Sequence, residues 1–439
     1  MVIIAKALKS INYRLFFAIL LIMLFPTIYQ TVRIFFLGSM PDDAGFNIAS
    51  QLAWVSLFYE VIQEALILPL FFILGKSLSD KDEFLNKIKS GILVTGAIYF
   101  VLSLVLFIFA RQLVEFMAQD KHLINATVDY VRIETIAALL STLFRFFLIV
   151  LITIKRYSYM YLTLLVQMLL SIILDTFFVS NLDISLKIGV NGIAIANIIV
   201  NSVNILFCVW LLKRENLSIF AKGKMAFSWM KEWFWVGKFS GLESLIRNVV
   251  FSLMILKMVN IISEQGSYWV ANNFIWHWLL LPTLALGDLI KKEIGEDKNN
   301  IQTKTFGYIV LTGIFALLWI GSIPIWKPFL HNVMNTDAYE TVYCIVLIQI
   351  AFYITFLFNN IFDSTFYGVG RTDYLLIQSI CINIFYYGIA FILYCNGIFI
   401  PSLLSISLLF GIGMALDFIP TIILYRRMLK KMNLHIIIK

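Results

Sequence analysis

Long apolar stretches separated by short polar loops are the main pattern of this sequence. Twelve stretches match the length of a membrane-crossing helix, because a hydrocarbon core of about 30 Å requires about 20 apolar residues. The predicted spans are 14–38, 47–75, 90–111, 123–152, 159–180, 189–213, 232–261, 267–291, 304–324, 338–367, 373–396 and 400–426. Helices are expected because backbone polar groups in lipid must be satisfied within the chain. The stretches are too long and too uniformly apolar for the strands of a membrane barrel.

The two halves of the chain repeat each other in short polar signals. Asp80 precedes the third span and Asp297 precedes the ninth, 217 positions later. Arg156 and Arg371, before the fifth and eleventh spans, are 215 positions apart. Repeats of six spans share one orientation and are related by an axis along the membrane normal. We therefore predict an all-α integral membrane protein with twelve transmembrane helices in two pseudo-symmetric six-helix bundles. The predicted domains are an N-terminal lobe at 1–215, a cytoplasmic linker at 216–231 and a C-terminal lobe at 232–439.

Charged residues are few and lie mostly outside the apolar stretches. They make up 14% of the chain, whereas hydrophobic residues make up 61%. Of the 34 Lys and Arg residues, 24 lie at the termini and in alternate loops, four in the remaining loops and six within spans. This asymmetry follows the positive-inside rule. It predicts a multi-pass protein of the plasma membrane with both termini cytoplasmic, whose net charge of +8 reflects topology and lipid headgroups and not nucleic-acid binding.

Two short motifs carry a resemblance to a known transporter family. The first is Leu174-Asp175 near the end of the fifth span, followed by Gly189-Val190-Asn191-Gly192-Ile193-Ala194-Ile195-Ala196 at the sixth. The second is Gly368-Val369-Gly370-Arg371-Thr372-Asp373 after the tenth span. With these motifs, the span count and the mid-chain linker, the sequence resembles the multidrug and toxic compound extrusion (MATE) family. The small residues also have a packing reason, because they let neighbouring helices approach closely.

The resemblance implies an exporter driven by inward flow of Na⁺ or H⁺, with a cleft between two lobes that opens to each side in turn. Some positions depart from the family pattern. The family commonly has an aspartate near the end of the first span, whereas this chain has Arg33 there. In span seven, Gly237-Lys238-Phe239 lacks the family's proline, and Arg247 stands where an acid is often found. We therefore expect an atypical member whose ion coupling does not depend on the first span.

Acidic residues inside the spans are candidates for ion coupling. An ionised side chain at mid-bilayer costs roughly 3 kcal/mol, so each one needs a partner or a function. Glu60 and Glu64 lie four positions apart on one face of the second span, and such a carboxylate pair favours binding of a proton or a cation. The alternative for each acid is neutralisation by a basic side chain. The predicted ion-coupling residues are Glu60, Glu64, Glu243 and Asp175.

Basic residues inside the spans predict ion pairs. Glu243 and Arg247 are four positions apart on the seventh span and can pair along the helix. Arg247 and Glu60 lie about equally deep in their spans, which predicts a charge cluster between spans two and seven and across the cleft. Arg33 and Asp175 lie equally far from the outer ends of their spans. We expect these two residues to form a fixed salt bridge in place of an exchangeable ion site.

Asparagines at helical spacing in the sixth span, and polar clusters in the eighth and tenth, predict a wet surface for substrate. Hydrogen bonding between helices is the alternative. The arginines within the spans favour an anionic or zwitterionic cargo. The predicted substrate-binding residues are Arg145, Arg247, Asn197, Asn201, Asn359, Asn360, Asp363, Asn273 and Trp276.

The sequence has no P-loop, HExxH motif or nucleophile elbow, so we do not expect an enzyme. Its four cysteines include no CxxC pair, so no metal is expected, and no cofactor beyond the coupling ion Na⁺ or H⁺. The predicted function is secondary-active export of a small organic molecule by a monomer surrounded by membrane lipids. The alternatives are a flippase for a lipid-linked anionic substrate and a non-transporting receptor or assembly factor on the same scaffold. A major-facilitator fold, which also has twelve spans, ranks third.

Overall fold

The computed structural model describes most of the chain as helices. The described residues are 2–40, 44–217, 219 and 225–434. Part of the predicted linker, 218 and 220–224, lies outside them. Contacts divide the chain into two compact units, which we call the N-terminal unit (Ile28–Ser252) and the C-terminal unit (Met1–Thr27 with Leu253–Lys439). Helix α2 (Tyr13–Gly38) contributes to both units.

The predicted spans are confirmed as helices, with most ends shifted by a few residues. Within the described residues, ten helical runs are long and apolar enough to cross a membrane. Besides α2, they are α6 (Lys81–Ile108), α8 (Ile124–Thr153), α9 (Tyr157–Phe178), α10 (Val190–Arg214), α11–η3–α12 (Met230–Phe251, Ser252–Leu256, Lys257–Ile261), α15 (Asn300–Asn332), α16 (Tyr339–Val369), α17–η5–α18 (Thr372–Ile382, Asn383–Tyr387, Gly388–Cys395) and α19 (Leu403–Met432). Short helices α1 (Val2–Lys9) and α7 (Ala110–Phe116) lie outside these runs.

The other two predicted spans are interrupted. The second consists of α3 (Ala44–Ala49), α4 (Leu52–Ile62), the π-helical turn η2 (Gln63–Ile67) and α5 (Leu70–Gly75). The eighth consists of α13 (Gln265–Asn273), η4 (Phe274–Leu279) and α14 (Leu281–Glu296), with a bend of 55° between η4 and α14. Pro69 and Pro282 lie at the two interruptions. Proline explains them in part, because it has no N–H to continue the helical hydrogen-bond ladder and its ring crowds the preceding turn.

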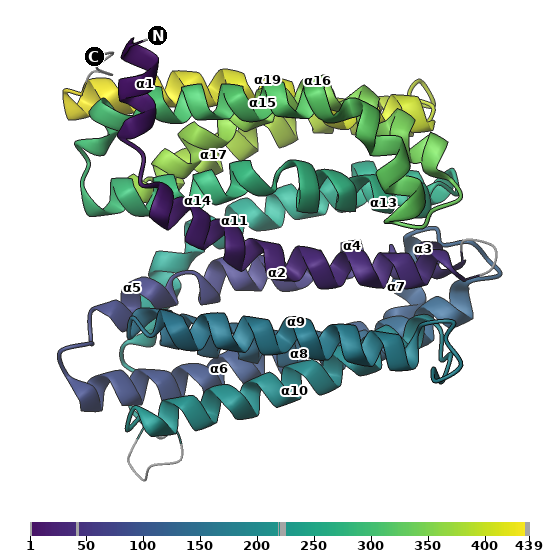
Figure 1. Ribbon diagram of the computed structural model, residues 1–439, viewed down its shortest axis with the longest axis horizontal. Helices are drawn as coiled ribbons and strands as arrows, with labels where there is room; N and C mark the ends of the chain where they lie inside the picture. Colours follow the sequence, from purple (N-terminus) through teal and green to yellow (C-terminus); the bar gives the residue numbers. More distant parts are fainter. Residues whose placement is uncertain (1, 41–43, 218, 220–224, 435–439) are drawn as a thin grey trace. The chain divides into compact units, whose positions relative to one another are not determined.

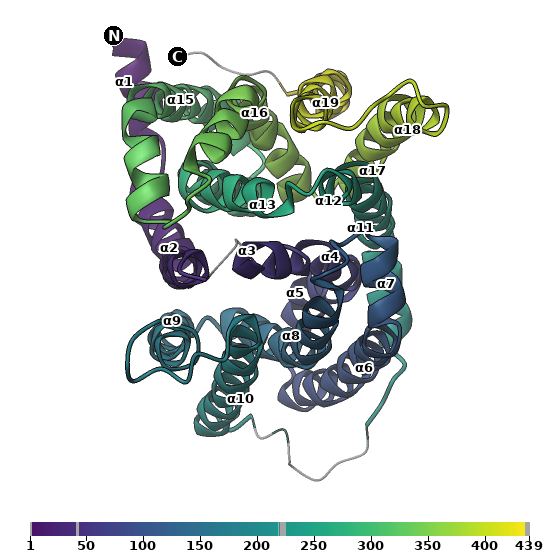
Figure 2. The same ribbon diagram turned by 90° about the vertical axis from the view of Figure 1, so that its right-hand side faces the viewer.

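In the N-terminal unit, α8 packs against both α6 and α10, and α10 also packs against α9 (Figures 1 and 2). Close packing uses small side chains: a Cβ atom added at Gly192 of α10 would lie 2.9 Å from the Cβ atom of Phe178. Helix α11 packs against α4 and η2 of the second span. The beginning of the seventh span therefore belongs to the N-terminal unit by its contacts.

In the C-terminal unit, α16 packs against α14, α15 and α19 (Figure 1). Buried aromatic residues fill the space around it, including Phe362, Phe366 and Tyr425, whose ring centroids lie 4.6 Å (Phe362–Tyr425) and 6.2 Å (Phe366–Tyr425) apart. Helix α1 packs against α15. That contact requires a glycine, because a Cβ atom at Gly307 would lie 2.6 Å from the carbonyl oxygen of Ala7.

Candidate functional site

A group of charged side chains joins the second and seventh spans within the N-terminal unit. Arg247 of α11 donates from Nη2 to Glu60 Oε1 of α4 at 3.1 Å and from Nε to Glu243 Oε1 at 3.0 Å. Both predicted contacts of Arg247 are therefore confirmed. The three residues all lie between Ile28 and Ser252, so these contacts are within one unit, and the expected position of the cluster across the cleft stays a prediction.

A second arginine reaches the same part of the second span. Arg145 of α8 donates from Nη1 to Oε1 of Gln63, three positions after Glu60. We call Glu60, Gln63, Arg145, Glu243 and Arg247 the span-two charge group. It combines two guanidinium groups with two carboxylates, and the backbone turn of η2 places Gln63 beside Glu64.

The span-two charge group is not buried. The Arg247 side chain is 45% exposed and that of Glu60 is 34% exposed, whereas that of Glu243 is 11% exposed. Arg145 is also exposed. Charges within a membrane span face a bundle interior or a water-filled cavity and avoid lipid, because transfer into hydrocarbon is costly. We therefore expect the exposed side of this group to face water and not lipid.

Helix α11 is held close to the second span by glycines. A Cβ atom at Gly237 would lie 1.7 Å from the carbonyl oxygen of Ala65, and one at Gly241 would lie 2.6 Å from the Cβ atom of Ala65. The two glycines are four positions apart, as in small-residue motifs that pack membrane helices together. The i+4 position of Ala65 is Pro69, which has no N–H to donate to this carbonyl.

Side chains of α11 also satisfy carbonyl groups of the π-helical turn. The Ser240 hydroxyl donates to the carbonyl oxygen of Glu64 at 2.8 Å, and Trp233 Nε1 donates to the carbonyl oxygen of Leu66 at 2.7 Å. Asn248 donates further along the same interface, to the carbonyl oxygen of Leu57 at 3.3 Å. The placement of Glu243 and Arg247 beside Glu60 thus depends on a long, specific helix contact.

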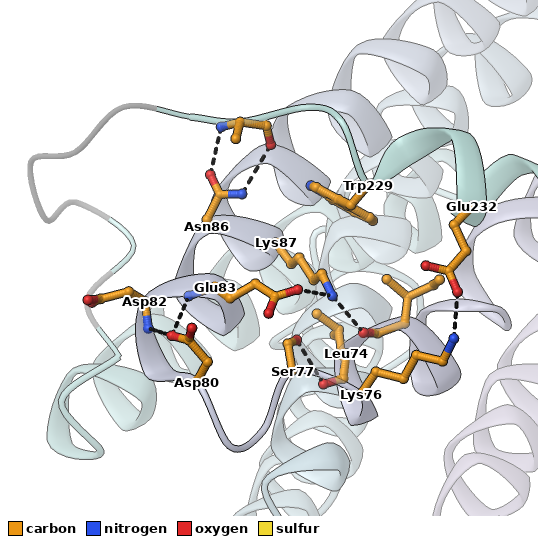
Figure 3. Close-up of polar contacts among 12 residues, drawn as sticks. Leu74, Lys76, Ser77, Asp80, Asp82, Glu83, Asn86, Lys87, Trp229 and Glu232 are labelled. Atoms are coloured by element: carbon orange, nitrogen blue, oxygen red, sulfur yellow. Dashed lines mark hydrogen bonds and ion pairs between the residues drawn. The ribbon is translucent and has the colours of Figure 1, made fainter.

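Figure 3 shows polar contacts where the second span ends and α11 begins. Lys76 Nζ lies 2.6 Å from Glu232 Oε1 of α11. Asn86 exchanges two hydrogen bonds with the backbone of Ala226, donating to its oxygen at 3.0 Å and accepting from its nitrogen at 2.8 Å. Lys76, in the turn between α5 and α6, therefore holds the start of α11, and Asn86 of α6 holds the chain before α11. Both contacts lie in the same unit as the span-two charge group.

A separate, buried network contains Arg33 and Asp175. Arg33 of α2 donates from Nε to Asp175 Oδ2 at 2.9 Å and from Nη2 to Oδ1 at 3.2 Å. Their side chains are 7% and 0% exposed. The predicted salt bridge is confirmed and is bidentate, which fixes its geometry. Asp175 was also predicted to couple ion movement, and that role stays a prediction.

Asn197 extends the network to a second acid. It accepts from Arg33 Nη2 at 2.9 Å, and its Nδ2 lies 3.0 Å and 3.2 Å from the two carboxylate oxygens of Glu134 on α8. Glu134 is 5% exposed. The buried network therefore holds two carboxyl groups and one guanidinium group, which balances only one of them.

The C-terminal unit contains a second polar group. Asn359 of α16 donates from Nδ2 to Asp363 Oδ2 at 3.1 Å and to Asp417 Oδ2 of α19 at 3.0 Å. Gln378 of α17 donates to the same Asp417 oxygen at 2.6 Å. We call these four residues the α16–α19 polar group. It brings Asn359 and Asp363, both predicted substrate ligands, together with two residues not chosen from the sequence.

The remaining predicted substrate ligands make contacts between or within helices. Asn360 donates to the carbonyl oxygen of Thr283 at 3.0 Å. Trp276 Nε1 donates to the Tyr353 hydroxyl at 3.0 Å and remains partly exposed. Asn273 and Asn201 each donate to a backbone carbonyl, of Trp269 at 2.9 Å and of Ala137 at 3.4 Å. Asn360 and Asn201 fit the alternative of bonding between helices, whereas Asn273 bonds within its own helix. The substrate role of these residues stays a prediction.

Sequence reasoning did not select Gln63, Glu134, Asp417 or Gln378. Glu134 and Asp417 were recognisable as acids within spans, but helical spacing relates only residues of one helix. Their partners lie on other helices, and no pattern within the chain indicates those pairings. Within the described residues, no group of three or more His, Cys, Asp or Glu side chains is placed to hold a metal ion.

Comparison with solved structures identifies the architecture. An inward-facing multidrug resistance MATE family transporter of the MOP superfamily matches with a TM-score of 0.74 and 17% identity, over 95% of this chain and 99% of that chain. An outward-facing structure of such a transporter matches with a TM-score of 0.65 and 17% identity, over 96% of each chain. The chain has the MATE transporter fold. Comparison of the sequence with family models and with curated proteins found no match.

Another match with the MATE transporter fold differs in the chemistry of its pocket. It is a MOP superfamily transporter from Pyrococcus furiosus, with a TM-score of 0.70 and 16% identity over 96% of each chain. The description of that protein states that its binding pocket has reverse polarity and that this suggests a different function.

Proposed function

We propose that this protein is a secondary-active transporter that exports small organic molecules by alternating access and is driven by Na⁺ or H⁺. It works as a monomer in the plasma membrane, with both termini cytoplasmic. The fold supports the transport part of the proposal, since MATE transporters of this fold are known in inward-facing and outward-facing conformations. The substrate, on this proposal, carries an anionic group.

The observation that carries the substrate class is the exposure of two arginines within membrane spans. Arg247 is 45% exposed although it pairs with two carboxylates, and Arg145 is exposed beside an uncharged glutamine. Guanidinium groups bind carboxylates and phosphates through paired hydrogen bonds. The reverse pocket polarity described for the Pyrococcus furiosus transporter is consistent with a non-cationic cargo on this fold.

Ion coupling is assigned to the acids of the second and seventh spans. Glu60 is 34% exposed, Glu64 is partly exposed, and the buried Glu243 is bound by the exposed Arg247. Asp175 is less suited, because Arg33 already occupies both of its oxygens. Coupling through the first span is excluded from the proposal, since Arg33 supplies a permanent cation there.

The test is solute flux in proteoliposomes under separate sodium and proton gradients. The probes are a fluorescent organic anion and an organic cation of similar size. We expect faster anion flux, dependent on one of the gradients, and a loss of about tenfold or more in Arg247→Gln and Arg145→Gln, which remove the charges expected to bind the anion. Arg132→Gln is the control, because Arg132 also lies on α8 and is partly exposed.

Other outcomes separate the alternatives. Preference for the cation with no effect of Arg247→Gln would refute the proposed substrate class. Gradient-independent movement of a lipid-linked anion between leaflets would indicate a flippase. Absence of flux for every probe, in protein that remains folded, would favour a non-transporting receptor.

A further inference from the structure

A hollow of about 490 Å³ lies over α16 in the C-terminal unit, with α15 and α19 at its sides. Its apolar surface comes from all three helices and includes Ile309, Phe362, Ile422 and Leu429. The hollow lies near the ends of these helices, since α15 begins nine positions before Ile309 and α19 ends three positions after Leu429. At 1.5 Å per helical residue it therefore extends roughly 15 Å inward from the end of the bundle.

Two basic side chains lie at the mouth of the hollow. Arg426 and Lys430 both line it, are exposed, and are four positions apart on one face of α19. No acidic residue is among the described residues that line the hollow. Neither cation forms an ion pair with a described carboxylate. Other basic residues of the same unit do so, such as Lys304 with Glu293 at 2.8 Å and Arg371 with Asp373 at 2.7 Å.

We propose that this hollow is a binding site for an anionic phospholipid of the surrounding membrane. The phosphodiester would lie between Arg426 and Lys430, and an acyl chain would lie along Ile309, Phe362, Ile422 and Leu429. A free phosphate would leave this apolar surface in contact with water, whereas a lipid covers it. Basic pockets between transmembrane helices at a membrane surface are recognised sites for anionic headgroups. The site is independent of substrate transport and requires no ion gradient.

The chain supplies its own matched control. Arg427 and Lys431 are also exposed, four positions apart and on α19, but they do not line the hollow. General attraction of anionic lipid to a basic helix end would depend equally on both pairs, since the long-range field is set by the number of charges. A built site depends on Arg426 and Lys430 alone.

The experiment measures thermal unfolding of the purified full-length protein in detergent as lipid is added. Phosphatidylglycerol is compared with phosphatidylcholine of the same acyl chains and with inorganic phosphate. We expect a saturable rise of the unfolding temperature with phosphatidylglycerol only. The apparent affinity should fall about tenfold or more in the Arg426→Gln/Lys430→Gln double variant and stay unchanged in Arg427→Gln/Lys431→Gln.

A second variant tests the apolar part. Ile422→Trp keeps both cations but places a larger ring where the acyl chain would lie, so the phosphatidylglycerol effect should be weakened about as much as in Arg426→Gln/Lys430→Gln. Equal losses in the two double variants, an equal response to phosphatidylcholine, or a rise produced by inorganic phosphate alone would each overturn the proposal. An unchanged response in Ile422→Trp would overturn it as well, and this variant decides the question if Arg426→Gln/Lys430→Gln does not fold.

Discussion

The arginines within the spans of the N-terminal unit have two different environments. Arg33 is buried and bound by both oxygens of Asp175, so the pair is a fixed part of the bundle. Arg247 makes two ion pairs but leaves 45% of its side chain exposed. Removing the carboxylate partner should therefore have different consequences at the two sites. At Arg33 it should lower stability, and at Arg247 it should change solute binding.

The buried network predicts unequal effects for its two acids. Asp175→Asn leaves Arg33 without a counter-charge and should destabilise the protein by roughly 3–5 kcal/mol. Glu134→Gln keeps an acceptor for Asn197 and removes the carboxyl group that Arg33 does not balance, so its effect should be much smaller. Thermal unfolding of the two purified variants measures the difference.

Charge exchange is the control for this pair. The double variant Arg33→Asp/Asp175→Arg should regain much of the stability lost in Asp175→Asn. Equal destabilisation by Asp175→Asn and Glu134→Gln would show that charge balance does not govern the network.

Sequence reasoning predicted the ion pairs better than the amide contacts. The spacing of Glu243 and Arg247 identifies one pair directly, and depth within a span identifies Arg33 with Asp175, because opposite charges in lipid must meet. An amide can bond to any nearby carbonyl or carboxylate, so nothing in the sequence showed that Asn197 connects Arg33 to Glu134.

At the scale of elements, hydropathy located the spans but not their interruptions. The window that detects a span averages over about 19 residues and responds to composition and not to backbone geometry. Pro69 was a visible signal for an irregular turn, but its consequence depends on the neighbouring helix. The carbonyl oxygen of Ala65 can lie close to α11 because Gly237 has no Cβ atom.

The glycine contact predicts a steric effect specific to one position. A Cβ atom at Gly237 would lie 1.7 Å from the Ala65 carbonyl oxygen, so Gly237→Ala must push α11 away from the second span. We expect a loss of roughly 1–3 kcal/mol, typical of overpacking, and a lower unfolding temperature. Gly313→Ala is the control, since a Cβ atom there meets nothing within 4 Å.

Gly313 lies within helix α15, where alanine has the higher helix propensity. Its replacement should leave the unfolding temperature unchanged or raise it slightly. If Gly237→Ala behaves in the same way, the close contact between α11 and the second span is not a constraint on this fold.

At the scale of the whole molecule, the sequence predicted the fold from span number, loop charge and the internal repeat, and the MATE transporter structures match it over almost the entire chain. The predicted lobe boundaries at 1–215 and 232–439 stay a prediction. The contact-defined units divide helix α2 after Thr27 and the seventh span after Ser252. Hydropathy cannot reveal this, because it does not show which neighbours a helix packs against.

Topology depends on the two interrupted spans. In the described part of the chain, ten helical runs are long and apolar enough to cross a membrane, and the bent pair Gln265–Leu279 and Leu281–Glu296 makes eleven if it is one span. Both termini lie on one side only if the pieces between Ala44 and Gly75 also cross the membrane, because that requires an even number of crossings. Each interrupted span can be tested by the side on which the following loops lie.

Single cysteines in a variant with all four native cysteines replaced provide this test. The probe positions, all of them exposed, are Ser79, Lys121, Asn299 and Asp337. If both interrupted spans cross, a membrane-impermeant maleimide added to intact cells should label Lys121→Cys and Asp337→Cys. Ser79→Cys and Asn299→Cys should react only after permeabilisation.

The pattern of labelling locates any error in this topology. If the eighth span enters and leaves on one side, Asn299→Cys reacts in intact cells and Asp337→Cys does not, while Ser79→Cys and Lys121→Cys keep their expected behaviour. If the second span fails to cross, every loop after it changes side. Ser79→Cys then reacts in intact cells, and Lys121→Cys does not. Because the positive-inside asymmetry rests on 24 basic residues in alternate loops, either exchange would place many of these charges on the outer surface, and twelve crossings avoid that.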